Sequence, residues 1–374
     1  MSVHPSLGRP AASPTPTRPS TRPPNGPVAT HAPAPSTSIP TPRPPASPAP
    51  TNVPVSVPHL LDGRPTCLRG QLHMPFPSGR HPDTDAVGEE MLAWLAGLGL
   101  LDARTANIFA RARFHELAGL VYHRSDRDVL RLAADFIAAL FVLDDLVDGG
   151  AHSTGRDEHA TRAAMAPLRE AARTGVASEG GEPSLRPVAE ALADLRRRLD
   201  ARGGTVEGWL AELDVYLDGV VEESGRRARG YDSVEDYAAV RVAFSAVYAC
   251  VELGLGCEGL RLTPALRRLA RAANLSVSFV NDVYSWPKER AIGERSNLVA
   301  VLAEHRGLDE RRAWAAACRA CDEVVAGHLS ARSGLGPGER RALPLLEAWM
   351  RGNYDWHAVG TERYTAALSV APAS

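Results

Sequence analysis

The sequence predicts an all-α protein whose helices form one large domain behind a disordered, proline-rich tail. Three observations support this fold class. From about Leu72 to the end of the chain, apolar residues recur at spacings of three and four, which is the period of an amphipathic helix. Alanine, leucine, arginine and glutamate dominate the same stretch, and all four are good helix formers. The stretch also lacks the alternating pattern of half-buried strands.

Residues 1–65 have a different composition from the rest of the chain. They hold 19 of the 30 prolines, and no acidic residue precedes Asp62. Proline blocks helix formation, and the segment has too little large apolar surface to offset the entropy lost on ordering. We therefore expect residues 1–65 to form a disordered tail and residues 66–374 to form the helical domain. A dispensable tail, a targeting sequence and a docking peptide for a proline-binding module are its three interpretations.

Glycine and proline predict where the helices begin and end. Breaks are expected at 149–150, around 175–187, at 203–204 and near 334–338. Thr263 followed by Pro264 is typical of a helix start, so a long helix is expected from there toward residue 290. Pro287 removes one hydrogen bond from that helix and clashes with the carbonyl of Val283, which predicts a kink. The whole pattern predicts roughly ten helices.

Charge and composition exclude several classes of protein. The 374 residues carry a net charge of −2 with scattered arginines, so no nucleic-acid partner is expected. The sequence has neither an apolar run long enough to span a membrane nor an apolar N-terminal segment, and we expect a cytoplasmic protein. Cys318 and Cys321 have the spacing of a redox or zinc motif. No second cysteine or histidine pair follows them, so we interpret them as inert helical thiols.

An acidic motif ends the apolar stretch that begins near residue 134. Asp144, Asp145 and Asp148 follow this stretch, and two glycines come next. Asp144 and Asp148 are four residues apart, so their carboxylates lie one turn apart on one helix face. They repel each other and oppose the helix dipole, which favours a bound cation such as Mg²⁺. A solvated acidic turn is the alternative for this motif alone.

A second polar stripe occurs near the end of the long helix. Asn281, Ser285 and Glu289 are spaced by four residues, so they lie on successive turns of one face. An amide oxygen, a hydroxyl and a carboxylate can together supply half of a site for a hard metal ion. Taken alone, the stripe is also typical of an ordinary polar helix face.

Together the two motifs, DDLVD at 144–148 and NDVYSWPKE at 281–289, resemble the metal-binding pair of bacterial class I terpene synthases. The resemblance implies a class I terpene synthase-like helical bundle around a central apolar cavity, with the motifs facing each other across its mouth. It also implies three Mg²⁺ ions between the motifs and a substrate diphosphate. The implied metal ligands are Asp144, Asp145 and Asp148 on one side and Asn281, Ser285 and Glu289 on the other.

Two further stretches resemble the diphosphate-binding parts of the same family. The segment YAAVR, ending at Arg241, is similar to the stretch that carries the arginine sensing the diphosphate, and Lys288 stands where a diphosphate-contacting lysine is common. The segment GNYDWHAVGTERY at 352–364 resembles the family's closing segment. There Arg363 and Tyr364 are implied to reach the diphosphate, with Trp356 near the cavity.

Other parts of the resemblance concern the opening of the domain and a helix break. Residues 76–87 resemble the stretch that opens the catalytic domain, and the likeness covers about residues 70–368. Phe244 and Ser245 correspond to a break whose backbone carbonyl is implied to aid ionisation, although a serine stands where glycine is frequent.

The function implied is that of a Mg²⁺-dependent terpene cyclase. Such an enzyme ionises a linear prenyl diphosphate and closes the carbocation into rings, with release of diphosphate. Arg241, Lys288 and Arg363 would neutralise the charge of the departing group. Aromatic faces stabilise cations, although ordinary core packing is the alternative for each ring. The candidate rings are Phe136, Phe141, Phe279 and Trp356.

The substrate and the assembly are further expectations. Farnesyl diphosphate is the expected substrate and geranylgeranyl diphosphate the second candidate. Ala138 and Ala139 on the expected wall helix permit a roomy pocket. A homodimer through helix faces is expected from the family alone.

Two other functions compete with the cyclase. A chain-elongating isoprenyl diphosphate synthase shares the helical bundle and one Asp-rich motif, but it would need a second Asp-rich cluster where residues 281–289 stand. A non-catalytic isoprenoid-binding or scaffold protein would use the tail as its working part. Against this second alternative, every expected metal position still carries an oxygen ligand.

Overall fold

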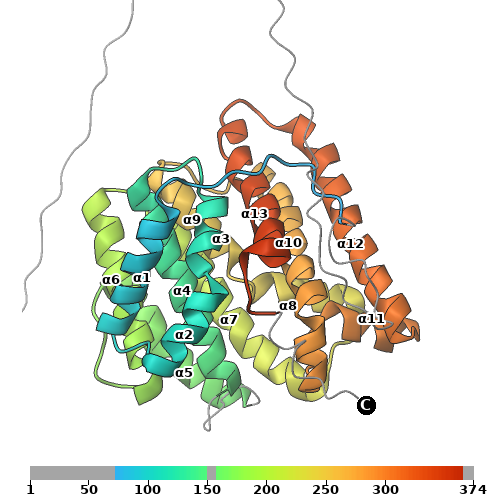
Figure 1. Cartoon of the computed structure of the whole chain (residues 1–374), viewed down its shortest axis with the longest axis horizontal. Helices are drawn as coiled ribbons and strands as arrows, with labels where there is room; N and C mark the ends of the chain where they lie inside the picture. The colour runs from blue at the N-terminus through green and yellow to red at the C-terminus, as the bar shows by residue number, and fades with distance from the viewer. Residues whose placement is uncertain (1–71, 150–156, 365–374) are drawn as a thin grey trace, which may run out of the picture. The chain divides into compact units, whose positions relative to one another are not determined.

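The computed structural model describes residues 72–149 and 157–364. The predicted tail of residues 1–65 lies outside this range. Within the described residues the chain forms helices joined by loops and turns, without a strand (Figure 1). The all-α fold class is therefore confirmed.

The described part of the chain contains thirteen α-helices and four short helical turns. The helices are α1 (Thr84–Gly97), α2 (Ala103–Ala112), α3 (Phe114–Val121), α4 (Arg127–Gly149), α5 (Glu158–Thr174), α6 (Arg186–Arg202), α7 (Glu207–Arg229), α8 (Val234–Ala243), α9 (Val247–Cys257), α10 (Pro264–Ala291), α11 (Leu298–Arg306), α12 (Glu310–Ala331) and α13 (Leu343–Asp355). The turns are η1 (Pro183–Leu185), η2 (Arg332–Gly334), η3 (Glu339–Arg341) and η4 (Trp356–Gly360).

Four helix ends fall where glycine and proline predict them. Helix α4 ends at Gly149, as expected. Helices α5 and α6 end with Gly175 and Gly203 in the left-handed conformation, at φ 71° and 73°, which glycine adopts at little cost. Helix α10 begins as predicted, with the Thr263 hydroxyl accepting a hydrogen bond from the backbone N–H of Leu266.

Two helix breaks fall at residues that carry no such signal. Arg113 separates α2 from α3 at φ 53°, and Ala246 separates α8 from α9 at φ 60°. The backbone of both residues is in the left-handed conformation, which residues other than glycine, asparagine and aspartate rarely adopt. Tertiary packing must therefore fix these breaks, and they help to explain why the described helices outnumber the roughly ten expected from sequence.

Helix α10 continues through Pro287 to Ala291. A proline at this position cannot donate a hydrogen bond to the carbonyl of Val283, four residues earlier. The indole Nε1 of Trp314, on α12, donates to that carbonyl instead, at 3.3 Å. The last turn of α10, which carries Glu289, therefore stays helical.

The central helices pack around one cavity. Helix α13 packs against both α3 and α10, α4 packs against α1, α3 and α6, and α7 packs against α5 and α9 (Figure 1).

Among residues 72–149 and 157–364, no single helix has the length and apolar composition to cross a membrane. One bent pair, α8 with α9, passes that test by length and composition only.

Candidate active site

A cavity of about 380 Å³ brings the two predicted motifs together. Its apolar wall includes side chains from α3, α4, α9, α10, α13 and η4: Leu117, Ile137, Leu140, Phe141, Val247, Cys250, Val277, Trp349 and Trp356. Its charged lining comes from α4, α7, α8, α10 and the loops that follow: Asp144, Asp145, Glu223, Arg227, Arg241, Asp282, Lys288, Glu289, Glu294 and Arg363. An apolar chamber with a charged rim can hold a molecule that has a long apolar part and an ionic head.

Helix α4 presents the acidic motif at the open end of this cavity. The side chains of Asp144 and Asp145 are 55% and 43% exposed, so both carboxylates remain accessible. Arg363 donates two hydrogen bonds to Asp145, at 2.8 and 3.3 Å, and lies 3.9 Å from Asp144. The C-terminal segment is therefore joined to α4 by a bidentate ion pair. The side chain of Asp148 lies outside the described part of the chain.

Helix α10 presents the second motif on the same cavity. Asn281 and Glu289 line it, and Ser285 lies between them in sequence with 1% of its surface exposed. The Ser285 hydroxyl hydrogen bonds to the Glu289 carboxylate, which also accepts a hydrogen bond of 2.9 Å from Asn297 Nδ2. Burial raises the pKa of Glu289. Pro287, where the sequence predicted a kink, does not take Glu289 away from the cavity, because Glu289 is among the residues that line it.

Arg241 is held in place by a buried carboxylate that the sequence did not single out. Its Nε donates to Asp282 Oδ1 at 3.0 Å, and its Nη2 donates to Asn281 Oδ1 at 3.0 Å. The second oxygen of Asp282 accepts hydrogen bonds from Tyr237 Oη at 2.6 Å and from the Leu298 N–H at 3.2 Å. Asp282 thereby joins α8, α10 and α11 behind the arginine. Its only sequence signal was its place beside Asn281.

The C-terminal segment closes another side of the cavity. Asn281 Nδ2 donates to Tyr364 Oη at 2.9 Å, and the Tyr364 ring stacks on His357 with centroids 5.2 Å apart. Burial lowers the pKa of His357 to about 4, so its ring is neutral near pH 7. His357 Nδ1 lies 2.8 Å from the carbonyl oxygen of Asn353, which leaves Nε2 to accept from Asn281 Nδ2 at 3.2 Å. Sequence reasoning did not identify His357, although it lies within the segment 352–364.

The remaining predicted residues also border the cavity. Lys288, Phe244 and Ser245 all line it, and the Phe244 ring centroid lies 4.7 Å from the guanidinium carbon of Arg241. Phe244 and Ser245 lie in the break between α8 and α9, where a helix break was expected. The structure thus collects the predicted diphosphate-binding residues around one opening.

Two of the four candidate aromatic rings face the cavity and two do not. Phe141 and Trp356 line it. Phe136 is fully buried in the core, 5.6 Å from Trp209, and Phe279 is 5% exposed. On α4 the residues that line the cavity are at positions 137, 140, 141, 144 and 145, and position 136 is not among them. Ala138 and Ala139 are buried and are not among the residues that line the cavity, so the cavity gives no support to the expectation of a roomy pocket from these alanines.

The oxygen atoms of the two motifs fit a hard divalent cation. They comprise carboxylates from α4 and an amide oxygen, a hydroxyl and a carboxylate from α10. Such ligands suit Mg²⁺ and other small hard ions better than soft metals. The guanidinium groups of Arg241 and Arg363 lie beside these oxygens and offer planar pairs of donors for phosphate oxygens.

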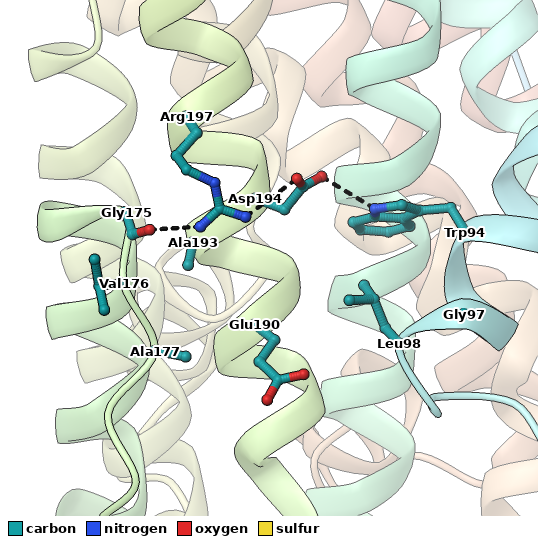
Figure 2. Close-up of a pocket in the computed structure, with 10 residues that line it drawn as sticks. All are labelled: Trp94, Gly97, Leu98, Gly175, Val176, Ala177, Glu190, Ala193, Asp194 and Arg197. Carbon is teal, nitrogen blue, oxygen red and sulfur yellow. Dashed lines mark hydrogen bonds and ion pairs between the residues drawn. The ribbon is translucent and has the colours of Figure 1, made fainter.

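A second depression, of about 540 Å³, lies between α1, α6 and residues 175–177 (Figure 2). Trp94 Nε1 donates to Asp194 at 3.1 Å, and Arg197 donates to the Gly175 carbonyl at 2.6 Å. The ten residues that line it include none of the predicted metal or diphosphate ligands. The chemistry indicated by the motifs therefore belongs to the cavity between α4 and α10.

A helical bundle with an apolar chamber and oxygen ligands beside arginines suits a protein that binds a substrate with an apolar chain and an anionic head. Residues 135–326 match the protein-family model described as terpene synthase family 2, C-terminal metal binding. The chain belongs to the terpene synthase family, and the resemblance read from its motifs is confirmed. It is a class I terpene synthase, a lyase that acts on a prenyl diphosphate, and the match supports a divalent metal cofactor.

Relatives of known activity cover most of the described chain. A (+)-T-muurolol synthase of Roseiflexus castenholzii that cyclises farnesyl diphosphate is 36% identical over 252 residues, which is 64% of this chain and 74% of the relative. A pentalenene synthase of Streptomyces arenae is 28% identical and covers 80% of this chain and 94% of its own. The solved structure of wild-type cucumene synthase superposes with a TM-score of 0.63 at 27% identity, covering 76% of this chain and 98% of that one. All three relatives are named as synthases, and the name of the first specifies cyclisation of farnesyl diphosphate, which supports a terpene cyclase.

Proposed function

We propose that the chain is a Mg²⁺-dependent cyclase that converts farnesyl diphosphate to a cyclic terpene and releases diphosphate. The observation that carries this proposal is that both polar motifs border one cavity with an apolar wall. Three cationic side chains suited to binding a diphosphate, those of Arg241, Lys288 and Arg363, border the same cavity. The relatives support the proposed length of the prenyl chain of the substrate, because the names of several of them specify farnesyl diphosphate. Geranylgeranyl diphosphate is the second candidate.

The proposed metal ligands lie on two helices that face the same cavity. Asp144, Asp145 and Asp148 come from α4, and Asn281, Ser285 and Glu289 come from α10. We propose that they hold three Mg²⁺ ions together with the substrate diphosphate. When bound, Mg²⁺ supplies positive charge to the diphosphate oxygens as a Lewis acid. Glu289, whose pKa is raised by burial, is more easily ionised when a cation lies near it.

The cationic side chains act on the departing group. Arg241 and Arg363 are held by Asp282 and Asp145, so their guanidinium groups are positioned before substrate arrives. In the proposed step the bond between C1 and the diphosphate oxygen breaks, and its electron pair leaves with the diphosphate. Arg241, Lys288, Arg363 and the Tyr364 hydroxyl stabilise the negative charge that grows there.

The apolar wall acts on the cation that remains. A double bond of the same chain attacks the allylic cation and closes a ring, which moves the positive charge along the carbon skeleton. Phe141, Phe244 and Trp356 line the cavity, and we propose that these aromatic rings stabilise that charge. A dry wall also keeps water from trapping the cation early. We propose that released diphosphate accepts the terminal proton, which completes the balance of atoms and charge.

The test is a product assay on the purified full-length chain. Geranyl, farnesyl and geranylgeranyl diphosphates are supplied separately, with and without Mg²⁺, and products are identified by gas chromatography and mass spectrometry. We expect cyclic products from farnesyl diphosphate only in the presence of Mg²⁺, and their loss in Asn281→Ala. Thr84→Val, which removes a buried hydroxyl from a residue that does not line the cavity, is the control and should retain the activity.

Other outcomes would replace the proposal. Longer linear diphosphates formed from mixed substrates would identify a chain-elongating synthase. If the protein binds a prenyl diphosphate without turning it over, and circular dichroism shows that it is folded, an isoprenoid-binding protein would be favoured. The expected homodimer is a separate proposal. Light scattering during size-exclusion chromatography, which measures the molar mass of the protein in solution, tests it.

A further inference from the structure

The break between α8 and α9 is an unusual piece of backbone at the cavity wall. Phe244, Ser245 and Ala246 form it, and all three line the cavity. Ala246 has φ 60°, a conformation that an alanine keeps only when its surroundings hold it there. The sequence of the break contains neither glycine nor proline, so its geometry has to come from neighbouring helices.

One neighbour is a buried amide on α10. Asn274 is 0% exposed and uses both ends of its side chain at the break. Its Nδ2 donates to the Val242 carbonyl at 3.1 Å, and its Oδ1 accepts from Ser245 Oγ at 2.8 Å. Ser278 Oγ, one turn further along α10, also donates to Oδ1, at 3.1 Å, and fixes the amide from behind. The last turn of α8 and the break are thus attached to α10.

The other neighbour is a glycine on α7. A Cβ atom on Gly219 would lie 2.6 Å from the carbonyl carbon of Ala243 and 2.6 Å from the backbone nitrogen of Phe244. Only a residue without a side chain lets α7 approach the break so closely. The break is therefore enclosed between the α7 backbone and the Asn274 amide.

We propose that Asn274 is a positioning residue that sets the shape of this break and, through it, the course of the cyclisation. Asn274 itself is not among the residues that line the cavity, so it acts through Phe244, Ser245 and Ala246. The Phe244 ring lies against the guanidinium of Arg241, and the break forms the adjoining wall. This inference rests on the proposed cyclase function, because it concerns how the same cavity holds the ionising substrate.

The first experiment compares Asn274→Ala with the Thr84→Val control, using farnesyl diphosphate and Mg²⁺. We expect kcat to fall by about 10-fold to 100-fold in Asn274→Ala while KM changes less than about twofold, because misplacement near reacting atoms affects the chemical step. We also expect a changed ratio of products. Loss of folded enzyme lowers the yield but leaves that ratio unchanged, so a merely structural role for Asn274 predicts the wild-type ratio.

The second experiment needs no turnover. Hydrogen exchange followed by mass spectrometry should show faster exchange in peptides covering residues 242–248 of Asn274→Ala, and wild-type exchange there in Thr84→Val. If Asn274→Ala does not fold, Ser245→Ala removes the 2.8 Å bond from the other side and should give the same two effects. Wild-type exchange at the break, or a wild-type product ratio with the wild-type kcat, would overturn the inference. Failure of the wild-type chain to convert farnesyl diphosphate would instead count against the proposed function, and the exchange result would still decide the role of Asn274.

Discussion

At the scale of single residues, candidate ligands carry a signal in the sequence, whereas the residues that hold them in place do not. Asn281, Ser285 and Glu289 are recognisable because their oxygen atoms recur at one helical spacing. Asp282 carries no such signal, since its partner Arg241 is 41 residues away and becomes its neighbour only on folding. The partners of a buried charge depend on the packing of several helices, which local spacing does not specify.

Asp282 yields the prediction at this scale. Asp282→Asn keeps the size of the side chain but removes the negative charge beside buried Arg241, which is 8% exposed. Because an unpaired buried charge is strongly destabilising, we expect the free energy of unfolding to fall by about 3 kcal/mol. We also expect kcat/KM to fall by about 100-fold, as Arg241 loses its orientation. Urea denaturation and product assays measure the two effects.

The control for this prediction is a carboxylate that also pairs with arginine but lies nearer the surface. Asp236 accepts from Arg226, and its side chain is 24% exposed. Asp236→Asn should change the free energy of unfolding by less than about 1 kcal/mol, because partly exposed ion pairs contribute little. Equal effects in the two variants would show that Asp282 has no special role.

At the scale of elements, helix starts and glycine ends are predictable because local chemistry determines them. The Thr263 cap and the glycine ends of α5 and α6 follow that rule. The breaks at Arg113 and Ala246 do not, since tertiary contacts override the preferences of both residues. Pro287 is a third case, because its effect on α10 depends on a donor from another helix.

Trp314 yields the prediction for this element. Trp314→Phe leaves the Val283 carbonyl without the donor that replaces the missing N–H of Pro287. A buried carbonyl without a partner costs about 1–3 kcal/mol, in addition to the volume lost with the smaller ring. Thermal and urea unfolding measure the sum. Activity should fall as well, because Glu289 lies on the last turn of the same helix.

A second buried tryptophan separates the two contributions. Trp209 is fully buried, and among the described residues its Nε1 makes no hydrogen bond. Trp209→Phe therefore loses the same ring volume without exposing a carbonyl. We expect Trp314→Phe to be more destabilising than Trp209→Phe by about 1–2 kcal/mol. Equal losses would mean that the indole bond does not compensate for Pro287.

At the scale of the whole molecule, the sequence predicts the class of fold and two motifs that border one cavity, but not which side chains form the cavity wall. Helical periodicity extends over the entire domain, so the fold class is readable from it. Which ring faces the cavity depends on the rotation of each helix about its axis. Phe136 and Phe141 show this, since only Phe141 lines the cavity although both precede the acidic motif on α4.

The boundary of the folded unit yields the last prediction. All proposed site residues lie between 141 and 364, whereas the described chain first enters the core at Leu72, Met74 and Phe76, which are 6%, 6% and 3% exposed. We propose that residues 1–65 are dispensable, so a chain starting at residue 66 should keep the unfolding temperature, the turnover and the products of the full chain. A chain starting at residue 77 should be less stable, because it loses three buried side chains and the Met74 carbonyl that accepts a 3.1 Å hydrogen bond from Arg351. If the chain that starts at residue 66 is folded but has lost turnover, the tail would instead have a direct part in catalysis.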